Sequence, residues 1–302
     1  MITLLCHTYT VALDYCGGKR NMINNINELI VGVVVLNYVK FNETIECVNS
    51  LLAQKDVLLT IAIVENGSEN ESYDELTKHF KNKNNICIIK SDINLGYAKG
   101  NNLGIQYLRD EGITDIFIAN SDLLFKSPYV LKQVKDSYEP DIGLISPIIC
   151  NPNGQIDQRV SYKMNFIYLR MLKKFVEWYF GITISFSKNR SDDGSIDYVK
   201  NITGIQNDRY IIAGSGYMLT KDFFAKYPGL YSGTFLYLEE WATIILLHKA
   251  GLKTKIAETD PIIHKGGAST PEKIKAMTKE RRRICLNSWK AILLLTVGIR
   301  KQ

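Results

Sequence analysis

The sequence lacks long apolar runs and closely spaced cysteines, and each absence excludes a class of protein. No segment reaches the about 20 uncharged apolar residues of a membrane span, and no basic stretch followed by an apolar one stands at the N-terminus. The six cysteines are far apart and show neither Cys-x-x-Cys nor Cys/His spacing. We therefore expect a cytoplasmic protein, not a secreted one, with reduced cysteines in its core and without structural zinc.

The sequence also lacks a large excess of charge of either sign. The 302 residues include 37 Lys or Arg and 31 Asp or Glu, which gives a net charge of +6. An ordinary solvated surface explains so small an excess, and so does an acidic partner such as a nucleotide diphosphate or an anionic membrane. Aromatic residues are not interleaved with the basic clusters as a stacking groove would require, so we expect no nucleic-acid partner.

What the chain does contain is an alternation of short apolar strands with helical patterns. Strands are predicted at residues 30–36, 58–64, 86–89 and 116–119. Between the first two, apolar residues recur at helical spacing at Ile45, Val48 and Leu52. This alternation predicts βαβ units and a mostly parallel sheet, which is an α/β fold. The four strand ends would then lie along one edge, where ligands bind in open α/β sheets.

Polar residues follow each predicted strand. They are Asn37 and Tyr38, then Glu65 and Asn66, then the segment 94–102, and finally Asn120, Ser121 and Asp122. Glu65 can accept hydrogen bonds from a base or a ribose, as acidic residues at strand ends do in dinucleotide-binding folds. Asp122 can coordinate a hard cation that bridges two phosphates, because Mg²⁺ and Mn²⁺ favour carboxylate, water and phosphate oxygens. Together these residues predict a nucleotide-binding crevice.

The segment 94–102 has the composition of an anion site at the start of a helix. Gly96 and Gly100 allow close backbone approach, and Lys99 supplies positive charge just before a helix N-terminus. Simpler interpretations stay open at this stage. Residues 66–68 also suit a tight turn, residues 94–102 a plain helix start, and Asp122 a helix N-cap.

These segments, in this order, resemble family 2 glycosyltransferases of the GT-A fold, and most closely the bacterial rhamnosyltransferase-like branch. The matching segments are residues 34–38, 64–68, 94–104 and 120–122. The resemblance implies a glycosyltransferase domain over 30–290, with a nucleotide-sugar-binding half at 30–125 and a mixed acceptor half at 126–290. An N-terminal extension at 1–29, for which disorder is one expectation, and a C-terminal tail at 291–302 would flank it. Met22 is an alternative start.

The resemblance also implies site residues. The nucleotide-sugar site would comprise Asn37, Tyr38, Glu65, Asn66, Asn94, Gly96, Tyr97, Lys99, Gly100, Asn101, Asn120 and Ser121. Gly214, Ser215 and Gly216 would line the acceptor side, and Asp122 and His264 would bind Mg²⁺ or Mn²⁺. Many relatives carry a second acid where this chain has Asn120, so metal binding would rest mainly on Asp122.

An acidic pair, Glu239 and Glu240, resembles the pair that opens a helix near the acceptor in this family. The second acid is the general base there, so the role falls to Glu240, with Glu239 in reserve. Two acids at a helix start are also explained by the helix dipole. A lone histidine such as His264 is more often structural than functional.

The activity that follows is an inverting transfer of a sugar from a nucleotide diphosphate, UDP- or dTDP-linked, to a hydroxyl of a bacterial surface glycan or lipid-linked acceptor. The aromatic and basic segment 162–187 and the apolar segment 291–297 fit a peripheral attachment to the inner face of the plasma membrane, although a helix packed on the domain explains the first equally. A non-catalytic nucleotide-sugar-binding protein remains the alternative. A sugar-1-phosphate nucleotidyltransferase is disfavoured, because residues 37–40 are not a Gly-rich phosphate loop.

Overall fold

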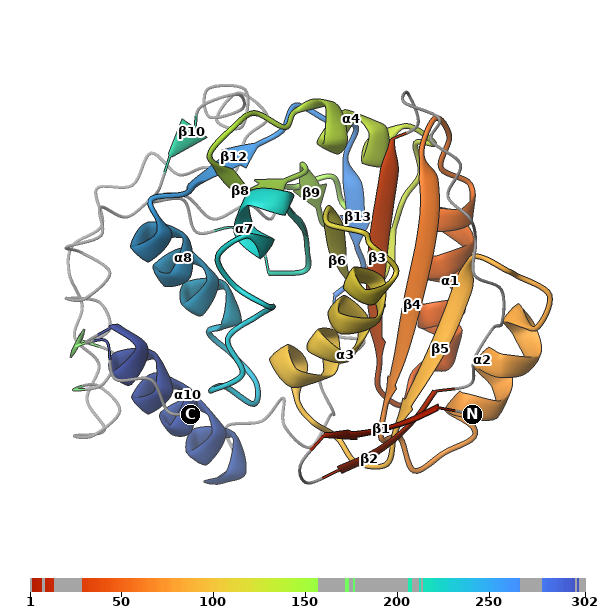
Figure 1. Cartoon of the computed structure of the whole chain (residues 1–302), viewed down its shortest axis with the longest axis horizontal. Coiled ribbons are helices and arrows are strands. Elements are labelled where there is room, and N and C mark those ends of the chain that lie inside the picture. The colour runs from red at the N-terminus through yellow and green to blue at the C-terminus, as the bar shows by residue number, and fades with distance from the viewer. Residues whose placement is uncertain are drawn as a thin grey trace.

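The centre of the molecule is a twisted sheet covered by helices on both faces (Figure 1). The computed structural model describes residues 2–6, 9–13, 29–156, 172–173, 176, 206–207, 212, 214–266, 279–296 and 298. Over these residues the main sheet has ten strands in the order β1-β2-β5-β4-β3-β6-β11-β8-β12-β10, and a second sheet has three, in the order β7-β13-β9.

The first half of the main sheet is a parallel βαβ arrangement. Its strands are β3 (Ile30–Asn37), β4 (Leu58–Asn66), β5 (Ile86–Ser91) and β6 (Ile116–Asn120), and its helices are α1 (Phe41–Leu52), α2 (Ser72–Phe80) and α3 (Tyr97–Asp110). All four strands predicted from the sequence are confirmed. Strands β5, β4, β3 and β6 lie side by side in that order and run in parallel.

Burial on both faces explains why these strands are continuous apolar runs. Along β3, Val31 and Val33 belong to a core cluster that includes residues of α1 and α2, whereas Val34 belongs to a second cluster that includes residues of α3. Successive strand residues point to opposite faces, so α1 and α2 cover one face and α3 covers the other. Figure 1 shows α3 on the opposite side of the sheet from α1.

The second half continues the same sheet. Its strands are β8 (Ile142–Ser146), β10 (Gln206–Asn207), β11 (Gly216–Leu219) and β12 (Lys253–Ile256), and its helices are α4 (Val130–Asp136), α7 (Lys221–Phe224), α8 (Glu239–Ala250) and α10 (Lys279–Thr296). Strand β11 runs antiparallel between β6 and β8, and β12 runs parallel to β8. Strands β5, β4, β3, β6, β8 and β12 therefore share one direction, which confirms an α/β fold with a mostly parallel central sheet.

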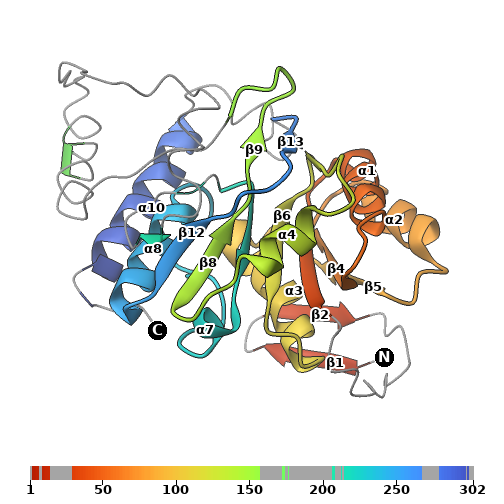
Figure 2. The ribbon, with the colours of Figure 1, turned by 90° about the horizontal axis from the view of Figure 1, so that it is seen from above.

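The small second sheet consists of β7 (Leu123–Leu124), β9 (Ile149–Cys150) and β13 (Ile262–His264). Strand β13 pairs in parallel with β9, and the two lie side by side in Figure 2. On its other edge β13 runs antiparallel to β7, with His264 opposite Leu123. This register brings His264 next to the residue that precedes β7, which is Asp122.

Both ends of the predicted domain contribute structure. Strands β1 (Ile2–Cys6) and β2 (Tyr9–Leu13) form an antiparallel hairpin, and β2 pairs with β5 at the edge of the sheet. Helix α10 runs through residues 291–296 of the predicted tail and packs against α8. Residues 14–28, and the segment 162–187 apart from 172–173 and 176, lie outside the described residues.

Two further expectations concern cysteines and membranes. Cys47, Cys87 and Cys150 are buried and unbridged, as expected for core cysteines. Of the helices that the structure describes, none combines the length and the apolar character needed to cross a bilayer.

Candidate active site

The carboxyl ends of β3, β4 and β6 bring the predicted nucleotide-binding residues to one edge. The chain places β4 and β5 on one side of β3 and β6 on the other, so a topological switch point lies between β3 and β6. Asn37 at the end of β3 pairs in register with Glu65 on β4, and Leu36 pairs with Asn120 on β6. Residues from three predicted segments are thus neighbours in space.

Asn37 and Glu65 are fully buried, and each has an unsatisfied polar atom. The Thr44 hydroxyl donates to Asn37 Oδ1 over 2.7 Å, and the Ser68 backbone N–H donates to Glu65 Oε1 over 2.9 Å. Among the described residues, Asn37 Nδ2 and Glu65 Oε2 have no hydrogen-bond partner. A buried donor and a buried acceptor left open at a strand end are groups that a bound base or ribose can satisfy.

The side chain of Asn66 instead organises the loop before α3. Its Nδ2 donates to Asn94 Oδ1 over 3.1 Å and to the Gly96 carbonyl over 3.3 Å, and its Oδ1 accepts the Leu95 N–H over 3.1 Å. The next residue, Gly67, has a φ of +70°, as a tight turn requires. Asn66 and Asn94 therefore support the loop before α3, and the chain leaves β4 at Gly67.

The first turn of α3 is held close to the sheet. A Cβ on Gly100 would lie 2.7 Å from Leu36 Cδ1, so glycine allows the helix to approach β3. Asn101 is fully buried and donates from Nδ2 to the Tyr97 carbonyl over 2.9 Å. Lys99 is exposed on the same turn. Of these residues, Lys99 is the one placed to meet an anionic group in solution.

Asp122 and His264 meet because β13 pairs with β7. Asp122 is buried, and its Oδ2 lies 3.4 Å from His264 Nε2. The Lys265 N–H donates to the Asp122 carbonyl over 3.1 Å, while Lys265 Nζ forms ion pairs with Glu43 and Glu46 on α1. Asp122 is followed by strand β7, so it is not a helix N-cap.

The donor set at Asp122 and His264 suits only one kind of cation. Among the described residues, no group of three or more His, Cys, Asp or Glu side chains gathers as a metal site. One carboxylate and one imidazole are too few for a closed protein site of the zinc type. They do fit Mg²⁺ or Mn²⁺, which keep water and substrate phosphate oxygens as further ligands.

The segment 214–216 passes between Asn120 and the acidic pair. The Ser215 carbonyl accepts the Asn120 N–H over 2.8 Å, and the Gly214 carbonyl accepts the Tyr97 hydroxyl over 3.0 Å. A Cβ on Gly216 would lie 2.8 Å from Leu123 Cδ1, and one on Gly214 would lie 3.6 Å from Glu240 Oε2. A small residue is therefore needed at Gly216, where β11 starts in close contact with Leu123 on β7, whereas a Cβ at Gly214 would be at ordinary van der Waals distance from Glu240 on α8.

The acidic pair opens α8, as predicted. Tyr237 and Leu238, directly before it, have φ values of +74° and +70°, a strained left-handed conformation for residues other than glycine. Glu239 is 9% exposed, and burial, with the nearby charge of Glu240, raises its pKa to about 8. Glu240 is less deeply buried and lies against Gly214. The two carboxyls therefore differ in burial and in position.

A family match decides the class of the protein. Residues 32–192, more than half of the chain, match the family described as glycosyl transferase family 2. The chain belongs to this family. No curated protein sequence matches it as a relative.

Solved structures resemble this glycosyltransferase in fold. The mannosyltransferase PcManGT from Pyrobaculum calidifontis, solved in complex with GDP-Man and Mn²⁺, aligns with a TM-score of 0.52 and 11% identity, over 89% of this chain and 70% of that one. Residues 1–349 of S. aureus TarS align with a TM-score of 0.50 and 12% identity, over 90% of this chain and 71% of that one. At such identities the likeness establishes the fold, which is GT-A.

Two contacts of this glycosyltransferase could not be found from its sequence. The Tyr97 hydroxyl reaches Gly214, 117 positions away, although the motif suggested a nucleotide-sugar role for Tyr97. Lys265, which directly follows β13, connects the end of this strand to α1 through its ion pairs. Neither residue carries a local pattern that predicts its partner, because both contacts depend on how distant segments pack.

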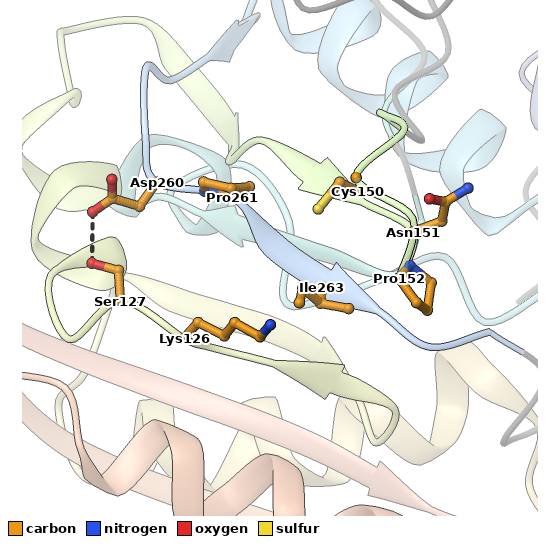
Figure 3. Close-up of a pocket in the computed structure, with 9 residues that line it drawn as sticks. Lys126, Ser127, Cys150, Asn151, Pro152, Asp260, Pro261 and Ile263 are labelled. Carbon is orange, nitrogen blue, oxygen red and sulfur yellow. Dashed lines mark hydrogen bonds between the residues drawn. The ribbon is translucent and has the colours of Figure 1, made fainter.

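A pocket of about 550 Å³ lies beside β13 (Figure 3). It is lined by Lys126, Ser127, Cys150, Asn151, Pro152, Gly154, Asp260, Pro261 and Ile263. None of these described lining residues was predicted as part of the site. Ile263 faces the pocket, so His264, the next residue on the strand, points to the opposite face. Asp260 accepts a hydrogen bond from the Ser127 hydroxyl over 2.6 Å, so part of the polar lining is already satisfied.

Proposed function

We propose that this family 2 glycosyltransferase is an inverting enzyme of the rhamnosyltransferase-like branch. It transfers a sugar from a nucleotide-diphosphate sugar to a hydroxyl of a bacterial surface glycan or lipid-linked acceptor. The observation that carries the proposal is the segment 214–216, which contacts Asn120 on the diphosphate side and Glu240 on the acceptor side. A displacement at an anomeric carbon needs its base and its leaving group held on either side of one short gap.

The nucleoside would be held at the strand ends. Glu65 Oε2 and Asn37 Nδ2 offer one acceptor and one donor there, which suits the polar edge of a base or the hydroxyls of a ribose. PcManGT was solved with GDP-Man and Mn²⁺, which supports a nucleotide-sugar donor and a divalent cation for this fold. We propose a UDP- or dTDP-linked donor, and the experiment below includes GDP-sugars.

The diphosphate would lie near Asp122 and His264, which would hold Mg²⁺ or Mn²⁺. When bound, the cation supplies positive charge beside the leaving phosphate oxygens. Ser121 and Asn120 complete the strand end, and exposed Lys99 on α3 would add a positive charge for the diphosphate. Asp122 is buried against His264, so its carboxylate is fixed before the donor binds.

Glu240 would be the general base. It accepts the proton of the acceptor hydroxyl while that oxygen forms a bond to the anomeric carbon. The bond from that carbon to the phosphate oxygen breaks on the opposite face, and its electron pair leaves with the nucleoside diphosphate, which inverts the centre. Glu239 is unsuited to the role near neutral pH, because its raised pKa keeps its carboxyl protonated.

The site of action proposed here is the cytoplasmic face of the membrane. The exposed face of α10 carries Arg282, Arg283 and Lys290, which adds to a chain of net charge +6. A basic face of this kind suits a peripheral contact with anionic lipid headgroups, near a lipid-linked acceptor. Nucleic acid is not among the proposed partners.

A donor screen tests the function. Wild-type protein is incubated with UDP-, dTDP- and GDP-sugars, with and without Mg²⁺ or Mn²⁺, and binding and nucleoside diphosphate release are measured. We expect one donor to turn over only with the metal. Glu240→Gln should lose turnover by about 10²- to 10⁴-fold and still bind that donor. Asp122→Ala and His264→Ala should lose the metal-dependent turnover.

Exposed Glu258 provides the control, because Glu258→Gln makes the same chemical change away from the site and should keep wild-type turnover. Metal-independent binding of a donor without any turnover would favour a non-catalytic nucleotide-sugar-binding protein. If the protein bound none of the nucleotide sugars, both functions would be contradicted.

A further inference from the structure

Tyr97 stands where three segments of the site meet. Its backbone N–H donates to the Phe235 carbonyl over 2.8 Å, and its hydroxyl donates to the Gly214 carbonyl over 3.0 Å. One residue of α3 therefore holds the segment that leads into β11 and the segment that leads into α8. Its own loop is held in turn by Asn66, the neighbour of Glu65 on β4.

The contact with Phe235 is unusually close. Gly96 has a φ of +79°, and a Cβ at this position would lie 2.2 Å from the Phe235 carbonyl oxygen. The backbone at Phe235 thus rests directly on the start of α3. From there the chain passes through the left-handed residues Tyr237 and Leu238 into the acidic pair. The start of α3 therefore supports the segment 235–238, which leads into the acidic pair and determines its position.

The second contact, between the Tyr97 hydroxyl and Gly214, lies beside the Glu240 carboxylate. Gly214 is the residue that Glu240 lies against, with 3.6 Å between Glu240 Oε2 and the position of a Cβ on Gly214. Burial raises the pKa of the Tyr97 phenol well above its ordinary value, and the nearby Tyr217 and Glu239 raise it further. The hydroxyl accordingly stays protonated and remains a hydrogen-bond donor to the Gly214 carbonyl over the working pH range.

We propose that Tyr97 is a positioning residue that fixes the Glu240 carboxylate relative to the donor sugar, by holding the Gly214 and Phe235 carbonyls at the same time. The proposal rests on the proposed function, in which Glu240 takes the acceptor proton. A misplacement of about 1 Å can cost on the order of 100-fold in rate without changing what the enzyme binds. The nucleoside contacts proposed at Asn37 and Glu65 do not involve the hydroxyl of Tyr97, so we expect donor binding to be independent of it.

The test compares two tyrosines. Tyr97→Phe removes only the hydroxyl that reaches Gly214, and the ring stays in place. Tyr227→Phe is the matched control, because the Tyr227 hydroxyl likewise donates to a backbone carbonyl, that of Leu246, over 2.9 Å. We expect kcat of Tyr97→Phe to fall about tenfold, with the donor KM unchanged within about twofold, and kcat of Tyr227→Phe to stay within about twofold of wild type.

Hydrogen exchange of the free protein gives a second readout that needs no activity. The peptide covering residues 214–219 should exchange several-fold faster in Tyr97→Phe than in wild type. The peptide covering residues 235–240 should not, because the backbone N–H that donates to Phe235 is kept, and Tyr227→Phe should leave both unchanged. Unchanged exchange of the 214–219 peptide in Tyr97→Phe, an unchanged kcat, or an equal loss of kcat in Tyr227→Phe would overturn the proposal. A raised donor KM with constant kcat would also overturn it, by making Tyr97 a donor contact. If the wild-type protein turns over no donor, the proposed function fails, while the exchange rates still decide whether the Tyr97 hydroxyl holds the segment at 214–219.

Discussion

Glu239 has a carboxyl that folding buries at the start of α8. Its pKa is raised from 4.5 to about 8, chiefly by burial. Between these two pH values the folded chain keeps a proton that the unfolded chain releases, so unfolding releases a proton and becomes easier as the pH rises. The stabilising contribution is complete below pH 4.5 and is lost as the pH rises through 8. The free energy of unfolding should fall by about 3–4 kcal/mol from this group between pH 5 and pH 8.

Urea unfolding at several pH values between 5 and 9 measures this dependence. Glu239→Gln replaces the titrating carboxyl with a neutral amide of the same shape, so its free energy of unfolding should vary less with pH over this window than that of wild type. Glu258→Gln removes an exposed carboxyl from the same half and should keep the wild-type slope. Equal slopes for Glu239→Gln and wild type would show that Glu239 is ionised in the folded protein.

Helix α3 can be tested as an element, because a glycine with positive φ stands at each of its ends. Gly96 has a φ of +79° and Gly112 a φ of +81°. A Cβ on Gly112 would meet nothing within 4 Å among the described residues, whereas one on Gly96 would meet the Phe235 carbonyl oxygen at 2.2 Å. Alanine at Gly112 bears a positive-φ backbone cost of about 1–2 kcal/mol. Gly96, with a ψ of −175°, lies in a backbone region that is essentially restricted to glycine, and the clash there adds about 1–3 kcal/mol more.

Denaturant unfolding of Gly96→Ala and Gly112→Ala separates these costs. Their difference in free energy of unfolding reports the contact between α3 and the segment at Phe235 together with the stricter backbone conformation of Gly96. We expect Gly96→Ala to be the less stable variant. Equal stability would mean that the segment at Phe235 moves away from α3 at little cost.

Elements differ in how far the sequence predicts them. Strands β3, β4, β5 and β6 are predictable because each is a short apolar run buried on both faces, and the acids and amides at their ends follow from that assignment. Strand β11, only Gly216–Leu219, inserts antiparallel between β6 and β8, whose partner residues lie far away in the sequence. The small sheet that brings His264 to Asp122 is likewise built from strands of two and three residues. Such elements exist because of tertiary pairing and have no periodic pattern of their own.

On the scale of the whole molecule, the two predicted halves share one sheet and one core. Strand β11 of the acceptor half pairs with β6 of the nucleotide half. The cluster on the α3 side of the sheet contains Val34 and Ala62 from one half with Tyr217 and Phe223 from the other. Separating the halves would expose the edge of β6 and this shared apolar surface, which burial stabilises by about 25 cal/mol per Å². The boundary near residue 125 is therefore not a boundary between separate folding units.

This continuity predicts a single unfolding transition, which a chain of 302 residues does not have by default. All three tryptophans, at 178, 241 and 289, belong to the acceptor half, so tryptophan fluorescence reports on that half, while far-UV circular dichroism reports on both. The two signals should show the same urea midpoint. A fluorescence midpoint clearly below that of the circular dichroism signal would mean that the acceptor half unfolds first. The β6–β11 pairing would then be too weak to couple the proposed base, Glu240, to the strand ends proposed to hold the nucleotide.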